Sequence, residues 1–142
     1  MKIPENQGHP KLLGEFLSQG LTIVVATPYL DEAERCARVA LVSAGRLLAL
    51  DAPSVLQHGM SGVMLEVVAT PVRTALQVLR ETVSPDRVQL FGDRLHVHVD
   101  DRAEAGGLVG HLQARGVEGA VARPILPTLE DVFIDRLARS HS

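Results

Sequence analysis

The order of apolar patterns between residues 63 and 125 limits the fold of this chain more than any other feature. Four runs typical of strands occupy residues 63–70, 88–92, 94–100 and 117–125. Apolar residues at helical spacing fill two intervals, 71–83 and 102–115. The pair Gly92-Asp93 separates the middle strands as a tight hairpin turn. The order is therefore β-α-β-β-α-β, which predicts an α+β fold of the ferredoxin-like type with both helices on one face of the sheet.

A further helix is predicted over residues 126–140. Thr128 is the expected N-cap, and Asp131 stands at the third helical position, where a capping box needs an acceptor. The apolar stripe of this helix favours a core position, with contact to a partner as the alternative. Its members are Leu129, Val132, Phe133 and Leu137.

The first sixty residues predict a different arrangement. Lys11–Gln19 has helical periodicity and is followed by Gly20, a common residue at helix ends. The continuous run Leu21–Ala26 is rich in β-branched residues and predicts a strand buried on both faces, as in parallel sheets. After it we expect a helix over 31–38, a hairpin around Ser43–Gly45 and a short helix over 53–58. The restart of the pattern near Gly62 predicts two domains, 1–61 and 62–142.

Charge and composition argue against a nucleic-acid partner. Lys and Arg number 14 against 17 Asp and Glu, with no basic stripe, and only 3% of the residues are aromatic. The clustered carboxylates Asp31, Glu32 and Glu34 are expected to cap and compensate a helix start. A lone cysteine, Cys36, excludes an intramolecular disulfide and a cysteine-based zinc cluster, and we expect an inert, half-buried thiol.

The apolar runs bear on the cellular location. The first ten residues, MKIPENQGHP, read as a loop and lack the apolar core of a secretory signal. The longest apolar stretches are much shorter than the ~20 residues of a membrane span. These patterns predict a cytoplasmic protein.

Two stretches carry a resemblance to a known family. The segment TIVVATPYLDEAERCARVALVSAGRLLALDAPSVL, residues 22–56, resembles the region around the switch-histidine loop of ABC-transporter ATPases. The stretch PTLEDVFIDRLA, residues 127–138, is similar to the ending of the drug- and lipid-exporter subfamily, after its small accessory domain. The two motifs stand in the family's order, about a hundred residues apart. The resemblance implies the last part of a nucleotide-binding domain followed by an accessory domain.

The departures from the family concern the groups that would hold nucleotide. The sequence contains no G-x-x-x-x-G-K-[ST] loop, no Leu-Ser-Gly-Gly signature and no Walker B strand. Pro28 occupies the position where the family places its switch histidine, and proline has neither a titratable group nor a donor. Because phosphoryl transfer depends on such positioning groups, we expect no catalytic residue, no bound cofactor and no ATP hydrolysis by these residues alone.

Two histidines form the weak candidate for a metal site. His96 and His98 alternate with apolar residues, so they share the strand face opposite the core. They could chelate a metal with His111 as a third ligand, but His111 is expected on the other side of the sheet, and no carboxylate or cysteine is obviously placed beside the pair. A half-exposed face used for docking is the favoured interpretation.

These inferences predict the C-terminal portion of an ABC-transporter ATPase subunit with a regulatory, docking or dimerisation role. The resemblance implies another ATPase subunit and a membrane permease as partners, and hence a place at the inner face of the membrane. Outside its family context, the apolar segment Leu21–Thr27 is expected either to pair with the chain's own hairpin or to be buried between two copies. The alternative is a small free-standing module that binds a small molecule or peptide on the sheet face that carries His96 and His98.

Overall fold

The structure is a computed structural model that describes residues 14–16 and 18–141. It is a mixed α/β structure with two antiparallel sheets, compatible with the predicted α+β class. The described strands are β1 (Val39–Ser43), β2 (Arg46–Asp51), β3 (Val63–Val68), β4 (Val88–Phe91), β5 (Arg94–Val99) and β6 (Val121–Ile125). The helices are α2 (Leu30–Ala33), α3 (Pro53–His58), α4 (Val72–Thr82), the 3-10 turn η1 (Pro85–Arg87), α5 (Glu104–Ala114) and α6 (Leu129–Ser140).

The larger sheet contains four strands in the order β4-β5-β3-β6, with every neighbouring pair antiparallel. The chain reaches this order as β3-α4-β4-β5-α5-β6, so each helix connects two strands that are not adjacent. Side chains alternate along the strands, and one set faces α4 and α5 to form the main core. Leu65, Val67, Leu95 and Val97 from the sheet are fully buried there with Leu79 and Leu112 from the helices.

The smaller sheet is the hairpin β1–β2. A bulge at Leu48 shifts the register, so that Leu41 pairs with Ala49 while Val42 pairs with Leu47. The inward set, Val39 and Leu41, packs with Leu56 of α3 and with Leu129 and Val132 of α6. The hairpin core therefore depends on residues almost a hundred positions away in the sequence.

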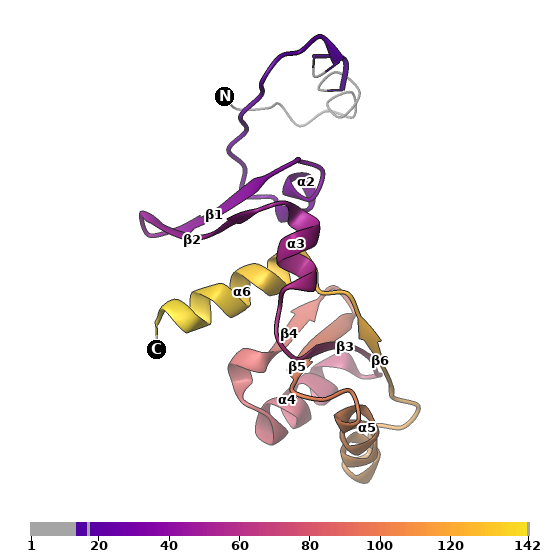
Figure 1. Cartoon of the computed structure of the whole chain (residues 1–142). Coiled ribbons are helices and arrows are strands. Elements are labelled where there is room, and N and C mark those ends of the chain that lie inside the picture. Colours follow the sequence, from indigo (N-terminus) through magenta and orange to yellow (C-terminus); the bar gives the residue numbers. More distant parts are fainter. Residues whose placement is uncertain (1–13, 17, 142) are drawn as a thin grey trace.

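Helix α6 lies between the hairpin and the four-stranded sheet (Figure 1). Its start agrees with the sequence prediction: the Thr128 hydroxyl accepts from the backbone N–H of Asp131 at 3.1 Å, and Asp131 completes a capping box. The predicted core stripe is also confirmed at Leu129 and Val132, with Phe133 partly buried against the same core. This stripe packs against the hairpin and α3, and not against the core of the four-stranded sheet that precedes it in sequence.

The prediction of a buried strand at Leu21–Ala26 is wrong. In the part of the chain that the structure describes, residues 21–27 have no regular secondary structure and belong to neither sheet, and Val24 is 77% exposed. The expected pairing of this segment with the chain's own hairpin is therefore also wrong. Figure 1 shows the segment as an open stretch of chain leading to α2. The apolar pattern indicates a segment that prefers burial, but no described part of the chain covers it.

Other expectations in the first half are met in part. Gly14–Phe16 and Ser18 are helical and Gly20 has φ of +81°, whereas the rest of the predicted helix and the first ten residues lie outside the described residues. The helix predicted over 31–38 is shorter, ending at Ala33 and continuing as turns, and Cys36 is exposed. No helix within residues 14–16 and 18–141 is both long and apolar enough to cross a membrane.

Candidate functional site

Two histidines on β5 face two aspartates on α6. His96 and His98 are two residues apart on one strand, so both point to the face of the sheet that α4 and α5 leave free. Asp131 and Asp135 are four residues apart on α6 and therefore lie one turn apart on one side of the helix. The distance between the two histidines along β5 thus matches the distance between the two aspartates along α6. His96 therefore meets Asp131, and His98 meets Asp135.

The His96–Asp131 contact is the buried centre of this arrangement. Nδ1 of His96 lies 3.0 Å from both carboxylate oxygens of Asp131, and the two residues are 6% and 2% exposed. Because an ionised carboxylate only accepts hydrogen bonds, Nδ1 carries the proton and donates. The same carboxylate also accepts from the backbone N–H of Thr128 at 2.9 Å and from its hydroxyl at 3.1 Å. Asp131 thus caps α6 and fastens it to the sheet.

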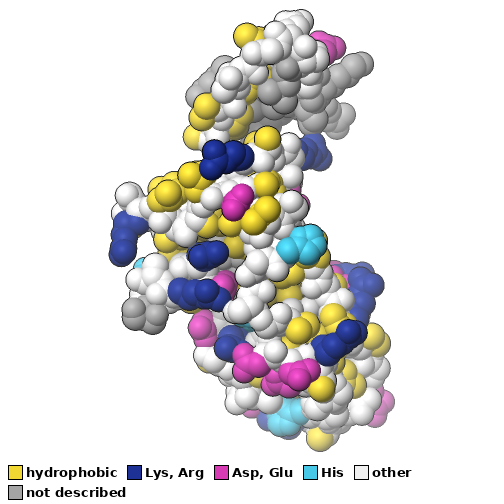
Figure 2. All heavy atoms as spheres, in the orientation of Figure 1, with side chains coloured by type: hydrophobic (Ala, Val, Ile, Leu, Met, Phe, Trp, Pro, Cys, Tyr) yellow, Lys and Arg dark blue, Asp and Glu magenta, His cyan; other side chains and the backbone are white. Residues whose placement is uncertain are grey.

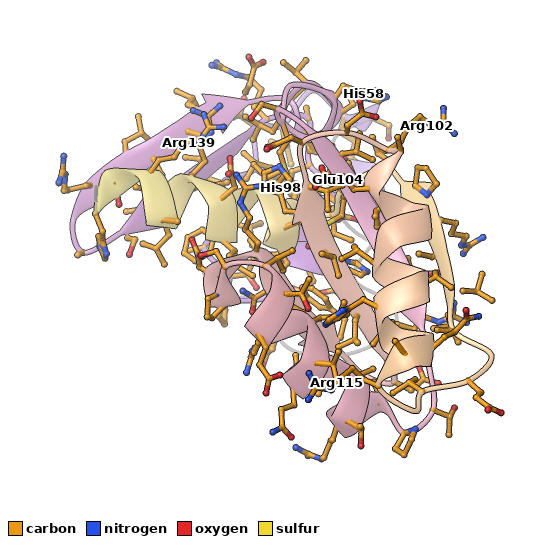
Figure 3. The ribbon with its side chains drawn as sticks, turned by 90° about the horizontal axis from the view of Figure 1, so that it is seen from below. His58, His98, Arg102, Glu104, Arg115 and Arg139 are labelled. Atoms are coloured by element: carbon orange, nitrogen blue, oxygen red, sulfur yellow. The ribbon has the colours of Figure 1, made fainter. Side chains whose placement is uncertain are left out.

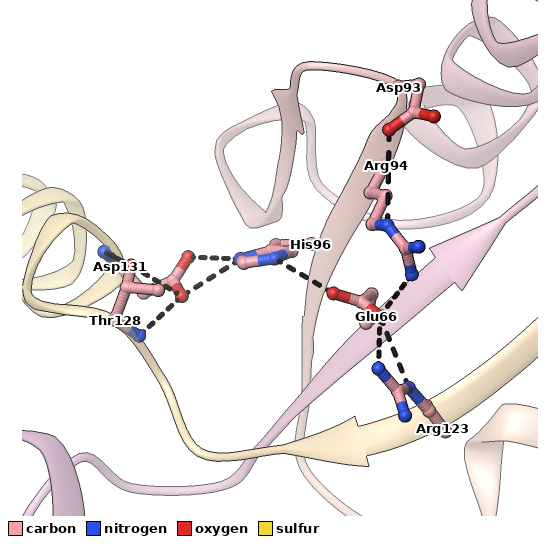
Figure 4. A network of polar contacts seen from close by, with 7 residues as sticks. All are labelled: Glu66, Asp93, Arg94, His96, Arg123, Thr128 and Asp131. Atoms are coloured by element: carbon pink, nitrogen blue, oxygen red, sulfur yellow. Dashed lines mark hydrogen bonds and ion pairs between the residues drawn. The ribbon is translucent and has the colours of Figure 1, made fainter.

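The other side of His96 faces an ion-pair cluster on the sheet. Nε2 of His96 lies 3.9 Å from Oε2 of Glu66, whose Oε1 accepts from Arg123 at 2.8 Å and from Arg94 at 2.9 Å (Figure 4). Hydrogen bonds from Arg123 and Arg94 lower the pKa of Glu66 below its usual value, although partial burial opposes them. The ring of Phe91 lies against that of His96, with centroids 4.4 Å apart. The imidazole is therefore enclosed by carboxylates and an aromatic ring.

His98 lines a cleft of about 290 Å³ between β5 and α6. Its Nε2 is 2.7 Å from the carbonyl oxygen of Ser61, and its Nδ1 is 3.9 Å from Asp135. Arg139 donates to the Ser61 hydroxyl at 2.9 Å and pairs with Asp135 at 3.2 Å. Figure 3 shows His98 and Arg139 on the side of the molecule where α6 lies. Arg87 also lines the cleft and pairs with Asp100 at 3.2 Å.

The structure corrects the expected surroundings of the two histidines. His96 is buried, and carboxylates stand beside both imidazoles, so the prediction of a half-exposed face without neighbouring carboxylates is wrong. The sequence spacing could not reveal this, because Asp131 lies 35 residues away and meets the sheet only when α6 folds back. His111 is on α5, across the sheet from the pair, as predicted. Within the described ranges, no group of three or more potential ligands is placed to hold a metal ion.

The region around Pro28 has its own local hydrogen bonds. Pro28 is exposed in the bend before α2. The Thr27 hydroxyl donates to Glu32 at 2.9 Å and accepts from the backbone N–H of Tyr29 at 3.0 Å. Asp31 and Glu32 lie in the first turn of α2, where their charges suit the helix dipole as predicted. The predicted capping role is wrong, because the N-cap is Tyr29 and no side chain makes a cap hydrogen bond there.

Glu34 has a role that the sequence did not reveal. Its Oε1 accepts from the backbone N–H of Leu129 at 3.1 Å, across 95 positions of sequence. That N–H belongs to the first turn of α6 and has no partner within the helix. The start of α6 is thus held from three sides, by its own capping box, by His96 on the sheet and by Glu34 beside the hairpin.

Comparison with known proteins identifies relatives of one kind. The chain is 32% identical over 131 residues to a Nod factor export ATP-binding protein I of Cupriavidus metallidurans, covering 89% of this chain and 40% of that protein. It is 34% identical over 123 residues to the daunorubicin resistance ATP-binding protein DrrA3 of Streptomyces coeruleorubidus, covering 81% of this chain and 37% of that protein. The related DrrA2 protein of the same organism is 32% identical over 125 residues.

These matches extend over most of this chain but only about two fifths of each relative. No family model matches the chain, and no solved structure matches it. The relatives are ATP-binding subunits of ABC transporters, and the shared region is their C-terminal portion. The chain is therefore related to the C-terminal portion of ABC-transporter ATP-binding subunits.

Proposed function

We propose that this chain acts as the C-terminal portion of an ABC-transporter ATP-binding subunit, where it regulates the subunit or docks it to others. The observation that carries the proposal is the match of most of the chain to this one portion of three ATP-binding proteins. The sequence also lacks a phosphate-binding loop, so these residues by themselves do not hydrolyse ATP.

The proposal assigns the two parts of the chain to two different domains. Residues 1–61 correspond to the end of the nucleotide-binding domain and residues 62–142 to a ferredoxin-like accessory domain. The strand order β4-β5-β3-β6 and two helices packed on one face support the ferredoxin-like assignment. Helix α6 belongs to the second domain by sequence but packs on the first, so it couples them.

The partners follow from the same proposal. In a transporter the chain would act with a second ATP-binding subunit and a membrane permease, at the cytoplasmic side of the membrane. When the rest of such a subunit is absent, the exposed segment Leu21–Thr27 gives the chain a tendency to self-associate, because apolar side chains and unpaired backbone groups remain in contact with water.

A second candidate function rests on the cleft beside His98. A binding module for a small molecule or peptide would use this cleft, whose lining offers Arg87, Arg139 and His98 beside the apolar Met60 and Met64. These charged side chains already have partners, Arg87 in Asp100 and both Arg139 and His98 in Asp135, which favours the transporter role over this one.

Exchange into a relative tests the proposed function. In DrrA3 the matching C-terminal portion is either deleted or replaced by this chain, and ATP turnover is measured together with resistance to daunorubicin. We expect deletion to abolish the regulated activity and replacement to restore it at least in part. If the replaced protein is as defective as the deleted one although it is folded and binds ATP, the proposed function is wrong.

A further inference from the structure

Helix α6 has an apolar side and a charged side, and each side meets a different part of the molecule. The apolar side packs with the hairpin and α3, where Leu129 and Val132 are 0% and 1% exposed. The side that faces the sheet carries Asp131, Asp135 and Arg139, spaced four residues apart. Figure 2 shows charged side chains gathered over α6 and its junction with the sheet, and hydrophobic side chains over the hairpin above. The helix is therefore held to the hairpin by apolar burial and to the sheet by polar contacts.

The contacts between α6 and the sheet become longer along the helix. In its first turn, Nδ1 of His96 lies 3.0 Å from the carboxylate of Asp131, and both residues are buried. One turn later, Nδ1 of His98 lies 3.9 Å from Oδ1 of Asp135, which is longer than a hydrogen bond. The helix therefore lies closest to the sheet at its start and diverges from the sheet toward its C-terminal end.

The junction between α6 and the sheet is incompletely packed. The cleft of about 290 Å³ lies along it, lined by Met64 and His98 of the sheet and by Ile134 and Asp135 of α6, among others. Protein interiors contain few voids larger than a water molecule, so the two layers are not packed against each other along this cleft. The buried apolar residues on the two sides also form separate clusters. The junction is thus as polar as an interface between domains, and such interfaces permit relative motion.

Helix α6 is fastened to the hairpin side of the molecule at its start. The chain passes from β6 to α6 through residues 126–128. There the side-chain amide of Gln57 in α3 donates to the carbonyl oxygen of Pro127 at 2.9 Å. Glu34 accepts from the backbone N–H of Leu129 at 3.1 Å. Because both bonds come from the hairpin side, the first residue of this connection is where it can bend.

The other connection, which leads from α3 to β3, is fixed at both of its ends. At the sheet end, Gly62 has φ of +74°, and a Cβ atom there would lie 2.5 Å from the carbonyl oxygen of Val99. The carbonyl oxygen of Ser61 accepts from Nε2 of His98 at 2.7 Å. At the hairpin end, the backbone N–H of Gly59 still donates to a carbonyl oxygen of α3 at 2.9 Å. The bend in this connection therefore falls between Gly59 and Ser61.

We propose that α6 and the hairpin move as one body on the four-stranded sheet, pivoting about the His96–Asp131 contact. The chain bends in the two connections. Movement toward the sheet brings Asp135 closer to His98 and narrows the cleft, and movement away widens it. Helix α6 therefore moves with the first part of the chain, although it follows the second part in sequence. The motion belongs to the chain itself and does not depend on the proposed function.

Distances between pairs of spin labels, measured by pulsed electron paramagnetic resonance, test the motion. In a Cys36→Ser background, cysteines are introduced in pairs at exposed positions: His141 after α6 with Val55 of α3, His141 with Gln77 of α4, and Gln77 with Gln113 of α5. Labelled protein is diluted with unlabelled chain, so that only distances within one molecule are measured. The His141–Val55 and Gln77–Gln113 pairs each lie within one body and should give narrow distributions. The His141–Gln77 pair spans the junction and should give a distribution about twice as broad.

Two results would overturn the proposal. One is a His141–Gln77 distribution as narrow as the other two, because the junction would then be rigid. The other is a narrow His141–Gln77 distribution with a broad His141–Val55 distribution, because α6 would then move with the sheet.

A matched pair of substitutions tests the contacts along the junction. Asp135→Ala removes a carboxylate that faces the sheet, and Glu130→Ala removes an exposed carboxylate of the same helix that does not line the cleft. We expect Asp135→Ala to broaden the His141–Gln77 distribution further and to leave His141–Val55 unchanged, whereas Glu130→Ala should change neither. Equal effects of the two substitutions on His141–Gln77 would contradict the proposal. If Asp135→Ala does not fold, the three label pairs in the otherwise unchanged chain still decide it.

Discussion

At the scale of single residues, the polar contacts of His96 determine how α6 meets the sheet. His96 and Asp131 are both buried, and each gives the other a hydrogen bond. Without that bond, removing either polar side chain from water would cost free energy. Glu66 on the other side is held by two arginines. The pair is therefore part of a continuous polar chain from β6 across the sheet to the helix.

Removing either partner of the buried pair should destabilise the chain. We expect His96→Gln and Asp131→Asn each to lower the free energy of unfolding by about 1–3 kcal/mol, because each leaves a buried polar group less well satisfied. The effects should be non-additive, with a coupling of about 1 kcal/mol or more in urea unfolding. Thr128→Ala weakens the cap but leaves both members of the pair in place, so it is the control for the cap alone and should cost about 0.5–2 kcal/mol. Additive effects of the first two changes would contradict the pairing.

The pKa of Glu66 makes one contribution to stability dependent on pH. The folded pKa lies below the ordinary value of 4.5, so the folded chain binds fewer protons in this range than the unfolded chain. The contribution of Glu66 is therefore present above that value and is lost as pH falls through the lower, folded pKa. Glu66→Gln should reduce the free energy of unfolding more at pH 7 than at pH 3, as measured by urea unfolding at both pH values. A difference between wild type and variant that is the same at both would exclude this linkage.

At the scale of elements, the sequence predicted the second half of the chain well. The strands and helices between residues 63 and 125 follow from periodicity because each one buries one face in the same core. The cap at Thr128 followed from local chemistry, since the capping box involves residues only three positions apart. The strand at 21–26 failed because its apolar pattern needs a neighbour that the described chain does not provide.

The site was less predictable than the fold. The shared face of His96 and His98 could be deduced from alternation, but their partners could not, since Asp131 and Asp135 arrive on a helix whose direction the sequence does not specify. The contact between Glu34 and Leu129 spans 95 positions and depends on both halves being folded. Long-range polar contacts of this kind leave no local pattern to detect.

Helix α6 should matter more to the hairpin than to the sheet that precedes it in sequence. Leu129 is fully buried against β1 and α3. Leu129→Ala should lower the free energy of unfolding by about 2–5 kcal/mol through lost contacts and a cavity. In hydrogen exchange, the amides of β1 and β2 should lose protection while those of β3 and β5 keep it. Leu126→Ala, at a half-exposed leucine just before the helix, is the control, and loss of protection confined to β3 and β5 would contradict this assignment.

At the scale of the whole molecule, two cores are joined by one helix. The first core collects residues from α2, the hairpin, α3 and α6, and the second lies between the four-stranded sheet and α4 and α5. The His96–Asp131 contact connects them. Helix α6 therefore contacts both cores, and the regulatory role that we propose would use it to couple the hairpin to the sheet.

The purified chain should not turn over ATP. Its sequence lacks the loop that holds nucleotide phosphates, so neither magnesium-ATP hydrolysis nor an increase of the thermal midpoint with magnesium-ATP is expected. The intact DrrA3 protein is the positive control for nucleotide binding. Turnover that co-purifies with the chain and disappears on a single substitution in it would refute this expectation.

The position of α6 has a consequence for biosynthesis. Leu129 and Val132 are translated long after Val39 and Leu41, yet they complete the same core. While the ribosome is still making the sheet, the nascent hairpin has its inner face uncovered and must wait for the closing helix. A stop codon just before α6 would thus leave the hairpin, which is made earlier than the helix, without the residues that complete its core.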